Sequence, residues 1–272
     1  MFNDGITPEA IPERIFQVGK ILSSKEMNAS DLFNCLEPAS LNSSDRSYFA
    51  IVKKAAIDLG VITERDDKTL ELAVDKKVFS TLDNFRFYCN SVIWKDRNSL
   101  FYKMVAAFLS SQDELLKYNN ITTPNVIQYV LNECGGSGVD IKKIRGIRFW
   151  LEFLGLGYIQ EKSYIYFLPN MYIALKDYVK YLDLEKKLEK KKEYSIREFV
   201  DLIKTVSNVA FEKMGTTLNL DLAFSNALRM MHDRKEIELK KNLDSKETWN
   251  LYKSDVHVFG NTVTHIVFKG IK

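Results

Sequence analysis

Residues Ile141 to Pro169 have the sequence IKKIRGIRFWLEFLGLGYIQEKSYIYFLP, and this stretch decides the fold. Its first half carries apolar residues at helical spacing on one side and basic residues on the other. Gly155 follows the last apolar position, where glycine favours the left-handed conformation that ends a helix. Two short apolar runs then flank the polar pair Glu161-Lys162, as in a β-hairpin. The apolar stripe of the predicted helix is Ile144, Ile147, Leu151 and Leu154.

The same pattern occurs earlier, in residues Tyr48 to Ala73 (YFAIVKKAAIDLGVITERDDKTLELA), where Gly60 precedes Gly155 by 95 residues. Two further helices are predicted before this copy, over Ile11–Leu22 and from Asn28 to about Leu36. Three helices followed by a hairpin are the local signature of a winged-helix module, which usually binds DNA or another protein. The sequence therefore points to a partner rather than to a reaction.

We predict a mainly helical α+β protein with small β-hairpins, in which tandem winged-helix modules are joined by a helical connector. A charge run after Leu182 indicates a semi-rigid spacer that extends a helix from Tyr172 to Glu193. The C-terminal module could be a third winged helix, although it lacks the Leu-Gly step. The predicted ranges are 1–80 for the first winged-helix module, 81–120 for the connector, 121–181 for the second winged-helix module, 182–194 for the spacer and 195–272 for the C-terminal module.

The 272 residues carry a net charge of only +3, which by itself does not mark a nucleic-acid binder. Residues 1–80 hold ten Lys and Arg against thirteen Asp and Glu, a balance of −3, whereas 81–181 and 182–272 are each at +3. No apolar run approaches the roughly 20 residues of a membrane span, and no secretory signal is expected. Three cysteines without a CxxC pair favour the reducing cytoplasm.

Basic side chains on the two predicted helices and their hairpin turns are the candidate DNA-binding residues. In a winged helix the third helix can lie in a major groove, and lysine or arginine there or on the hairpin contacts phosphate. The alternative is that these charges form the solvated side of an amphipathic helix. This alternative weighs more for the first copy, where four acidic residues between Asp58 and Asp67 would repel phosphate. The candidates are Arg46, Lys53, Lys54 and Lys68 in the first copy, and Lys142, Lys143, Arg145, Arg148 and Lys162 in the second.

No catalytic, cofactor or metal site is expected from the motifs. The glycine-rich stretch Gly135–Gly138 lacks the Lys-Ser/Thr step of a phosphate-binding loop, and a turn between two helices is the better interpretation. His232, His257 and His265 have no further ligands at zinc spacing. No GxSxG motif occurs, and no cysteine has a histidine nearby in the sequence. We therefore predict a protein that is not an enzyme.

Aromatic residues cluster between Phe85 and Phe108. Stacking on single-stranded nucleic acid is one use for such a set, but its roughly helical spacing favours packing in a core. Tyr164 and Tyr166 alternate with Ile165, which gives one side of the predicted strand an aromatic surface suited to a protein partner.

Several short segments carry a resemblance to a known family. They are Asn3-Asp-Gly5, Ile11-Pro-Glu-Arg-Ile-Phe16, Phe85-Arg-Phe87 and Phe108-Leu-Ser-Ser-Gln-Asp113, together with the winged-helix copy among them. This set resembles the DpdG-like proteins, which are accessory components of bacterial deazaguanine DNA-modification and restriction clusters. The resemblance covers roughly residues 3 to 170 and brings no catalytic residues with it. It implies a non-catalytic role in a DNA-modification or antiviral (phage) defence system.

We therefore expect a cytoplasmic protein that binds double-stranded DNA and other subunits of a defence or DNA-modification assembly. A second resemblance, to the tandem winged-helix subunits of SMC-type complexes, implies a scaffold that binds only protein. A third alternative is a helix-turn-helix transcriptional regulator, which would need a homodimer to match a two-fold operator. Neither a cofactor nor a membrane partner is expected.

Overall fold

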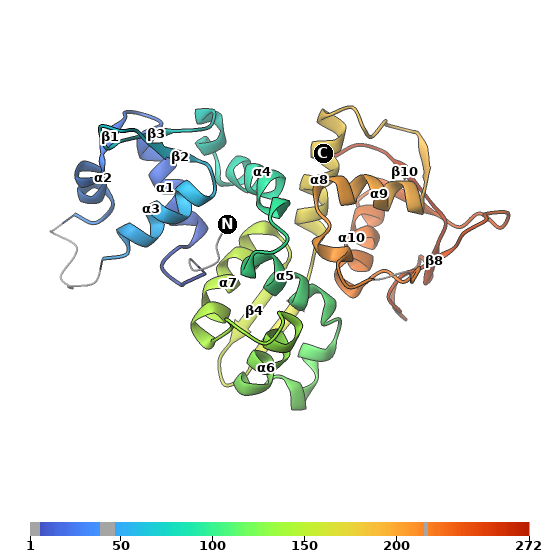
Figure 1. Cartoon of the computed structure of the whole chain (residues 1–272). Coiled ribbons are helices and arrows are strands. Elements are labelled where there is room, and N and C mark those ends of the chain that lie inside the picture. Colours follow the sequence, from blue (N-terminus) through green and yellow to red (C-terminus); the bar gives the residue numbers. More distant parts are fainter. Residues whose placement is uncertain (1–5, 39–46, 215–216, 272) are drawn as a thin grey trace.

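The computed structural model describes residues 6–38, 47–214 and 217–271. Over these ranges the protein is α+β, with helices and small antiparallel sheets in three lobes that meet at α4 (Leu82–Val92; Figure 1). We call them the N-terminal lobe (6–79), the middle lobe (100–169) and the C-terminal lobe (172–271). None of the described helices has the length and the apolar character needed to cross a membrane.

In the N-terminal lobe, three helices pack against a three-stranded sheet. Asn28 begins the second helix, because its side-chain oxygen accepts a hydrogen bond from the backbone N–H of Asp31 at 2.9 Å. The sheet order β1-β3-β2 places the first strand beside the last. The predicted helices over 11–22 and 28–36 are confirmed to within one residue. The elements are α1 (Pro12–Leu22), β1 (Met27–Asn28), α2 (Ala29–Leu36), α3 (Phe49–Asp58), β2 (Ile62–Glu64) and β3 (Thr69–Leu72), followed by a 3-10 turn at Lys76–Phe79.

The middle lobe has three helices and a two-stranded hairpin. The backbone N–H of Ile165 donates to the carbonyl oxygen of Ile121 at 2.8 Å, so the chain before α6 runs beside β5. Phe108 of α5 packs against Phe167 of β5, with ring centroids 5.1 Å apart. By its packing α5 therefore belongs with this lobe, whereas we predicted it in the connector. The elements are α5 (Leu100–Ser110), α6 (Thr123–Glu133), α7 (Ile141–Leu154), β4 (Gly157–Glu161) and β5 (Ile165–Pro169).

The C-terminal lobe follows the chain order of the N-terminal lobe: helix, strand, helix, helix and two further strands. Its sheet order, β6-β10-β7, again places the first strand beside the last. A second small sheet, β8-β9, interrupts the hairpin. Ser195 begins α9, because its side chain accepts a hydrogen bond from the backbone N–H of Glu198. The elements are α8 (Tyr172–Leu184), β6 (Glu193–Ser195), α9 (Ile196–Val206), α10 (Leu222–Asp233), β7 (Ile237–Lys240), β8 (Trp249–Asn250), β9 (Thr262–Val263) and β10 (His265–Phe268).

The predicted helix from Tyr172 to Glu193 is wrong, because α8 ends at Leu184. The chain beyond it turns back toward the sheet, which buries Leu188 to 2% exposure, and Glu193 enters β6. The backbone N–H of Glu189 donates to the hydroxyl of Tyr194 at 2.7 Å and fixes the turn. Residues 182–194 are thus not a helical spacer, and α8 packs against α9 and α10 of its own lobe.

The third long helix of every lobe ends in the same way. The residue after the helix cap lies in the left-handed region: Gly60 (φ 69°), Gly155 (φ 71°) and Lys235 (φ 60°). In each case its N–H bonds to a carbonyl three residues back, and the next N–H bonds five residues back, at distances of 2.8 to 3.1 Å. The predicted left-handed glycines are therefore confirmed, and a lysine occupies the same position in the C-terminal lobe.

Replacing Lys235 with glycine should raise the free energy of unfolding by about 1 kcal/mol, because a side chain at this backbone angle is strained. Gly60→Ala is the matched control and should lower the free energy of unfolding by a similar amount. The nearest atom to an added Cβ is 3.8 Å away, so the cost comes only from the backbone angle. Urea denaturation of both variants measures the difference. An unchanged Lys235→Gly midpoint would count against strain at this joint.

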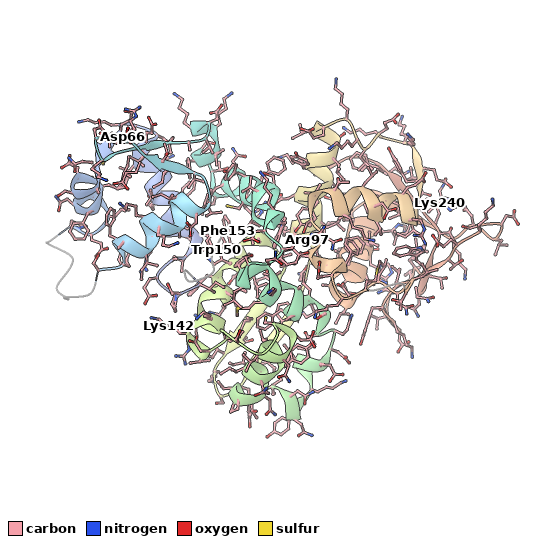
Figure 2. All side chains as sticks on the ribbon, in the orientation of Figure 1. Asp66, Arg97, Lys142, Trp150, Phe153 and Lys240 are labelled. Atoms are coloured by element: carbon pink, nitrogen blue, oxygen red, sulfur yellow. The ribbon has the colours of Figure 1, made fainter. Side chains whose placement is uncertain are left out.

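Side chains of α4 join the three lobes. Asp177 of α8 is 6% exposed and accepts hydrogen bonds from Arg86 Nε and Asn90 Nδ2 of α4, both at 2.9 Å. Asn90 also donates to the carbonyl oxygen of Leu154 at 3.2 Å, where α7 ends. Phe153 lies nearby where the lobes meet (Figure 2). The lobes are thus tied at their junction by a buried polar network.

Candidate nucleic-acid interface

The basic helix of the middle lobe is α7, and its ends are fixed by local sequence. The Asp140 side chain accepts a hydrogen bond from the backbone N–H of Lys143 at 2.8 Å, which begins the helix. The predicted apolar stripe is buried against the lobe, as expected. The opposite side carries Lys142, Arg145 and Arg148, of which Lys142 is exposed on the flank of the lobe (Figure 2). The helix therefore presents its cations outward.

Glu161 of β4 lies between the two arginines of α7. Arg145 donates from Nε and Nη2 to the Glu161 carboxylate at 2.7 to 3.1 Å, and Arg148 Nη1 lies 3.8 Å from Oε2 of Glu161. The hydrogen bonds from Arg145 lower the pKa of Glu161, so its carboxylate stays ionised at neutral pH. Two guanidinium groups thus share one carboxylate, and a DNA phosphate would compete with Glu161 for them.

The remaining cations of this set lie close by. Lys143 Nζ is 3.9 Å from Asp140, too far for a strong ion pair. Lys162 is exposed at the hairpin turn directly after Glu161, where its backbone N–H donates to the Tyr164 carbonyl oxygen. Arg145, Arg148 and Lys162 thus meet where helix and hairpin touch, whereas Lys143, two residues before Arg145, points to another side of α7.

The first copy is more fully neutralised within its own lobe. Lys53 Nζ lies 3.2 Å from Glu64 of β2, and Lys54 Nζ lies 2.8 Å from Asp58 one turn along α3. Lys68 is at the hairpin turn with φ 68°. Arg46 lies outside the described residues. The local acids leave the first copy less free positive charge than the second, as its sequence indicated.

The N-terminal segment of the chain lies directly on α7. A Cβ added to Gly146 would meet the backbone N and C atoms of Thr7 at 2.8 Å, so only glycine permits this approach. Trp150 Nε1 donates to the carbonyl oxygen of Ala10 at 2.9 Å. Sequence reasoning missed this contact, although an isolated glycine inside a predicted helix is a signal of close packing.

Arg229 of α10 is a second residue that sequence reasoning missed. Its side chain is 3% exposed, and only Nη2 has a partner among the described residues, the Asn261 side-chain oxygen at 2.9 Å. The Nε and Nη1 groups are buried without a hydrogen-bond partner. Burial lowers the pKa of this guanidinium. An arginine within an otherwise apolar helix sequence was the available signal.

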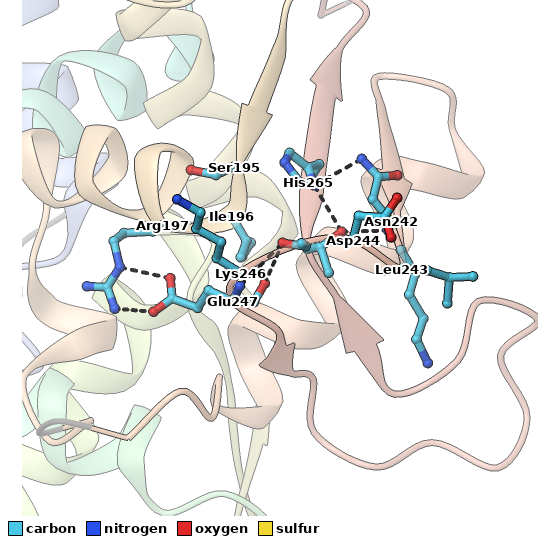
Figure 3. A pocket seen from close by; sticks show the side chains of 12 residues that line it. Ser195, Ile196, Arg197, Asn242, Leu243, Asp244, Lys246, Glu247 and His265 are labelled. Atoms are coloured by element: carbon cyan, nitrogen blue, oxygen red, sulfur yellow. Dashed lines mark hydrogen bonds and ion pairs between the residues drawn. The ribbon is translucent and has the colours of Figure 1, made fainter.

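A hollow of about 900 Å³ opens beside the C-terminal sheet (Figure 3). Its polar groups are paired with each other: Arg197 Nε donates to Glu247 at 2.8 Å, and the Ser195 hydroxyl donates to Glu198 at 2.8 Å. His265 Nδ1 lies 3.0 Å from the Thr264 hydroxyl. The Arg197–Glu247 pair joins α9 to the loop after β7, and the Ser195–Glu198 pair caps α9.

The possible metal ligands and the buried cysteines of the described residues are the remaining candidates for a site. Over these residues, no cluster of three or more His, Cys, Asp or Glu side chains could hold a metal ion. Complete burial raises the pKa of the Cys89 thiol, and burial raises that of Cys134 to about 11, which keeps both protonated.

Comparison with known proteins finds no matching family, no matching curated protein and no matching solved structure.

Proposed function

We propose that this protein is a non-catalytic component of a bacterial DNA-modification or phage-defence system, which binds double-stranded DNA and protein partners through winged-helix modules. The single observation that carries the DNA part is the pair Arg145 and Arg148 on α7, which share Glu161 of the hairpin, with Lys142 and Lys162 exposed on the same helix and hairpin. The third-helix position of α7 and its cations suit contacts to phosphate. The resemblance to DpdG-like proteins supports the biological setting.

The winged-helix assignment rests on chain order and sheet order. The N-terminal and C-terminal lobes share helix-strand-helix-helix-strand-strand, with the first strand beside the last. We infer a third winged helix for the C-terminal lobe from this agreement.

Fluorescence anisotropy with duplex DNA across a salt series tests the proposal. Wild type should bind with a log-affinity slope of roughly −0.9 per phosphate contacted. Alanine at Lys142, Lys143, Arg145 and Arg148 should remove about 2 to 3 units of slope and at least roughly tenfold in affinity. The matched control replaces Lys53, Lys54 and Lys68 with alanine and should change both far less.

Glu161→Gln sharpens the test, because it removes the carboxylate that competes with phosphate. This variant should bind DNA several-fold more tightly than wild type at equal salt, with its arginines unchanged. If neither wild type nor Glu161→Gln binds DNA at low salt, the proposed DNA binding is contradicted.

A second candidate is a scaffold that contacts only protein, as in SMC-type complexes. It is favoured by the outer side of the β4-β5 hairpin, where Tyr158 and Leu168 pair across the strands at 46% and 45% exposure. Tyr118, 70% exposed, extends this surface through its hydroxyl, 3.1 Å from that of Tyr164. Exposed aromatic surfaces of this kind suit protein partners. A transcriptional regulator would in addition require a dimer, which sedimentation would detect.

A further inference from the structure

Residues 251–261 lie along α10 and cover it. The backbone N–H of Tyr252 donates to the Ser225 hydroxyl at 2.8 Å, and Arg229 donates to Asn261 at 2.9 Å. Further along, His257 Nε2 lies 3.0 Å from Asp233. These contacts follow α10 from its first turn to its last, so the segment runs the length of the helix. The side of α10 that carries Ser225 and Arg229, 0% and 3% exposed, is therefore covered.

The covering segment is lightly held. It has no helix or strand between β8 and β9, and its hydrogen bonds to α10 come from a few side chains. Val256 and Val258 are 95% and 103% exposed, so they bury nothing, whereas Phe259 packs on His232 with ring centroids 5.5 Å apart. Lifting the part beyond Leu251, which is itself 4% exposed in the core, breaks few hydrogen bonds to α10 and uncovers chiefly Phe259.

Arg229 gives the covered surface a chemical preference. A buried guanidinium is strongly desolvated and is normally balanced by a carboxylate or phosphate. Among the described residues, no acidic side chain forms an ion pair with Arg229, and two of its nitrogen groups lack any hydrogen-bond acceptor. The free protein thus holds a cation that would be better stabilised by an anion than by its present surroundings.

We propose that Arg229 is a phosphate-binding residue and that residues 251–261 cover it until the phosphodiester backbone of DNA displaces them. The inference rests on the proposed DNA-binding function and adds a second contact surface on the C-terminal lobe. Arginine suits this role because its planar fork donates two parallel hydrogen bonds to phosphate oxygens.

Arg229→Met is the first test, because it keeps the volume and removes the charge. In the free protein it should raise Tm by about 3 °C, since a desolvated, unpaired cation is gone. In the DNA titration it should lower affinity roughly tenfold and remove about 1 unit of salt slope. The control is Arg234→Met, an exposed cation directly after the same helix, which should not raise Tm.

A second variant tests the cover separately from Arg229. His257→Ala with Phe259→Ala removes the contacts of the segment to Asp233 and His232. This variant should bind DNA more tightly than wild type.

The outcomes separate the two proposals. Wild type that binds DNA, with no loss in Arg229→Met and no gain in His257→Ala/Phe259→Ala, overturns the Arg229 site and leaves the α7 surface standing. Loss of binding only in the α7 variants overturns the Arg229 site in the same way. If wild type and the His257→Ala/Phe259→Ala variant both fail to bind DNA, both proposals fall.

Discussion

Replacing Trp150 with alanine should lower the free energy of unfolding by about 4 kcal/mol, the usual cost of deleting a large buried ring. Trp150 is 1% exposed, and its ring meets those of Phe101 and Phe153 edge-on, at 6.0 and 6.1 Å between centroids. Its Nε1 hydrogen bond to Ala10 is also lost, which leaves that buried carbonyl oxygen without this donor. The loss therefore combines a cavity with an unpaired polar group.

Urea denaturation followed by far-ultraviolet circular dichroism measures this change. Trp150→Phe should lose less than half as much, because most of the ring volume remains. Tyr158→Ala provides a surface control on the same lobe, where truncating a half-exposed ring should cost about 0.5 kcal/mol. A loss below about 1 kcal/mol for Trp150→Ala would contradict its central place in the packing.

Asp177→Ala should cost about 3 kcal/mol, because it leaves the Arg86 guanidinium without its buried partner. The Asp177 carboxylate accepts hydrogen bonds from both Arg86 and Asn90 of α4, so two donors lose their acceptor at once. Since these groups join α4 to α8, the variant should also loosen the junction between lobes. Limited proteolysis near residue 170 would reveal such loosening.

Asp83→Ala is the matched control for Asp177→Ala. Asp83 contacts the same arginine at 2.5 Å, but its side chain is 80% exposed, so its removal should cost about 0.5 kcal/mol or less. Asp177→Leu combined with Arg86→Met removes both charges and should be far less destabilising than Asp177→Ala alone. Equal losses for Asp83→Ala and Asp177→Ala would show that burial does not govern this ion pair.

Local patterns predicted much of the fold. The apolar stripe of α7 and the left-handed Gly60 and Gly155 depend on residues within one or two turns, and the structure has them as expected. The predicted helix through Glu193 failed for a non-local reason. Leu188 and Tyr194 find burial against the sheet, and that outweighs the helical preference of the surrounding lysines and glutamates.

The candidate site was predictable only in part, for the same reason. Arg145 and Arg148 are three residues apart, so their shared side of α7 followed from helical spacing, which places Lys143 on another side. The ion pair between Arg145 and Glu161 could not be predicted, because it depends on how the hairpin lies against the helix. Arg229 and Asn261 are 32 residues apart, and nothing in the spacing of either indicates that they meet. Contacts between residues that are far apart in the sequence of one lobe therefore could not be predicted from local sequence patterns.

The contact between the N-terminal segment and α7 imposes an order on folding during synthesis. Trp150 follows Ala10 by 140 residues, so a ribosome adding about 5 to 20 residues per second makes α7 roughly 7 to 28 s after the segment that docks on it. During that interval Ile6 and Ala10, which are 1% and 0% exposed in the finished chain, have no surface to cover them. Residues 6–10 are thus made well before the helix on which they dock, and their docking requires that α7 has already formed.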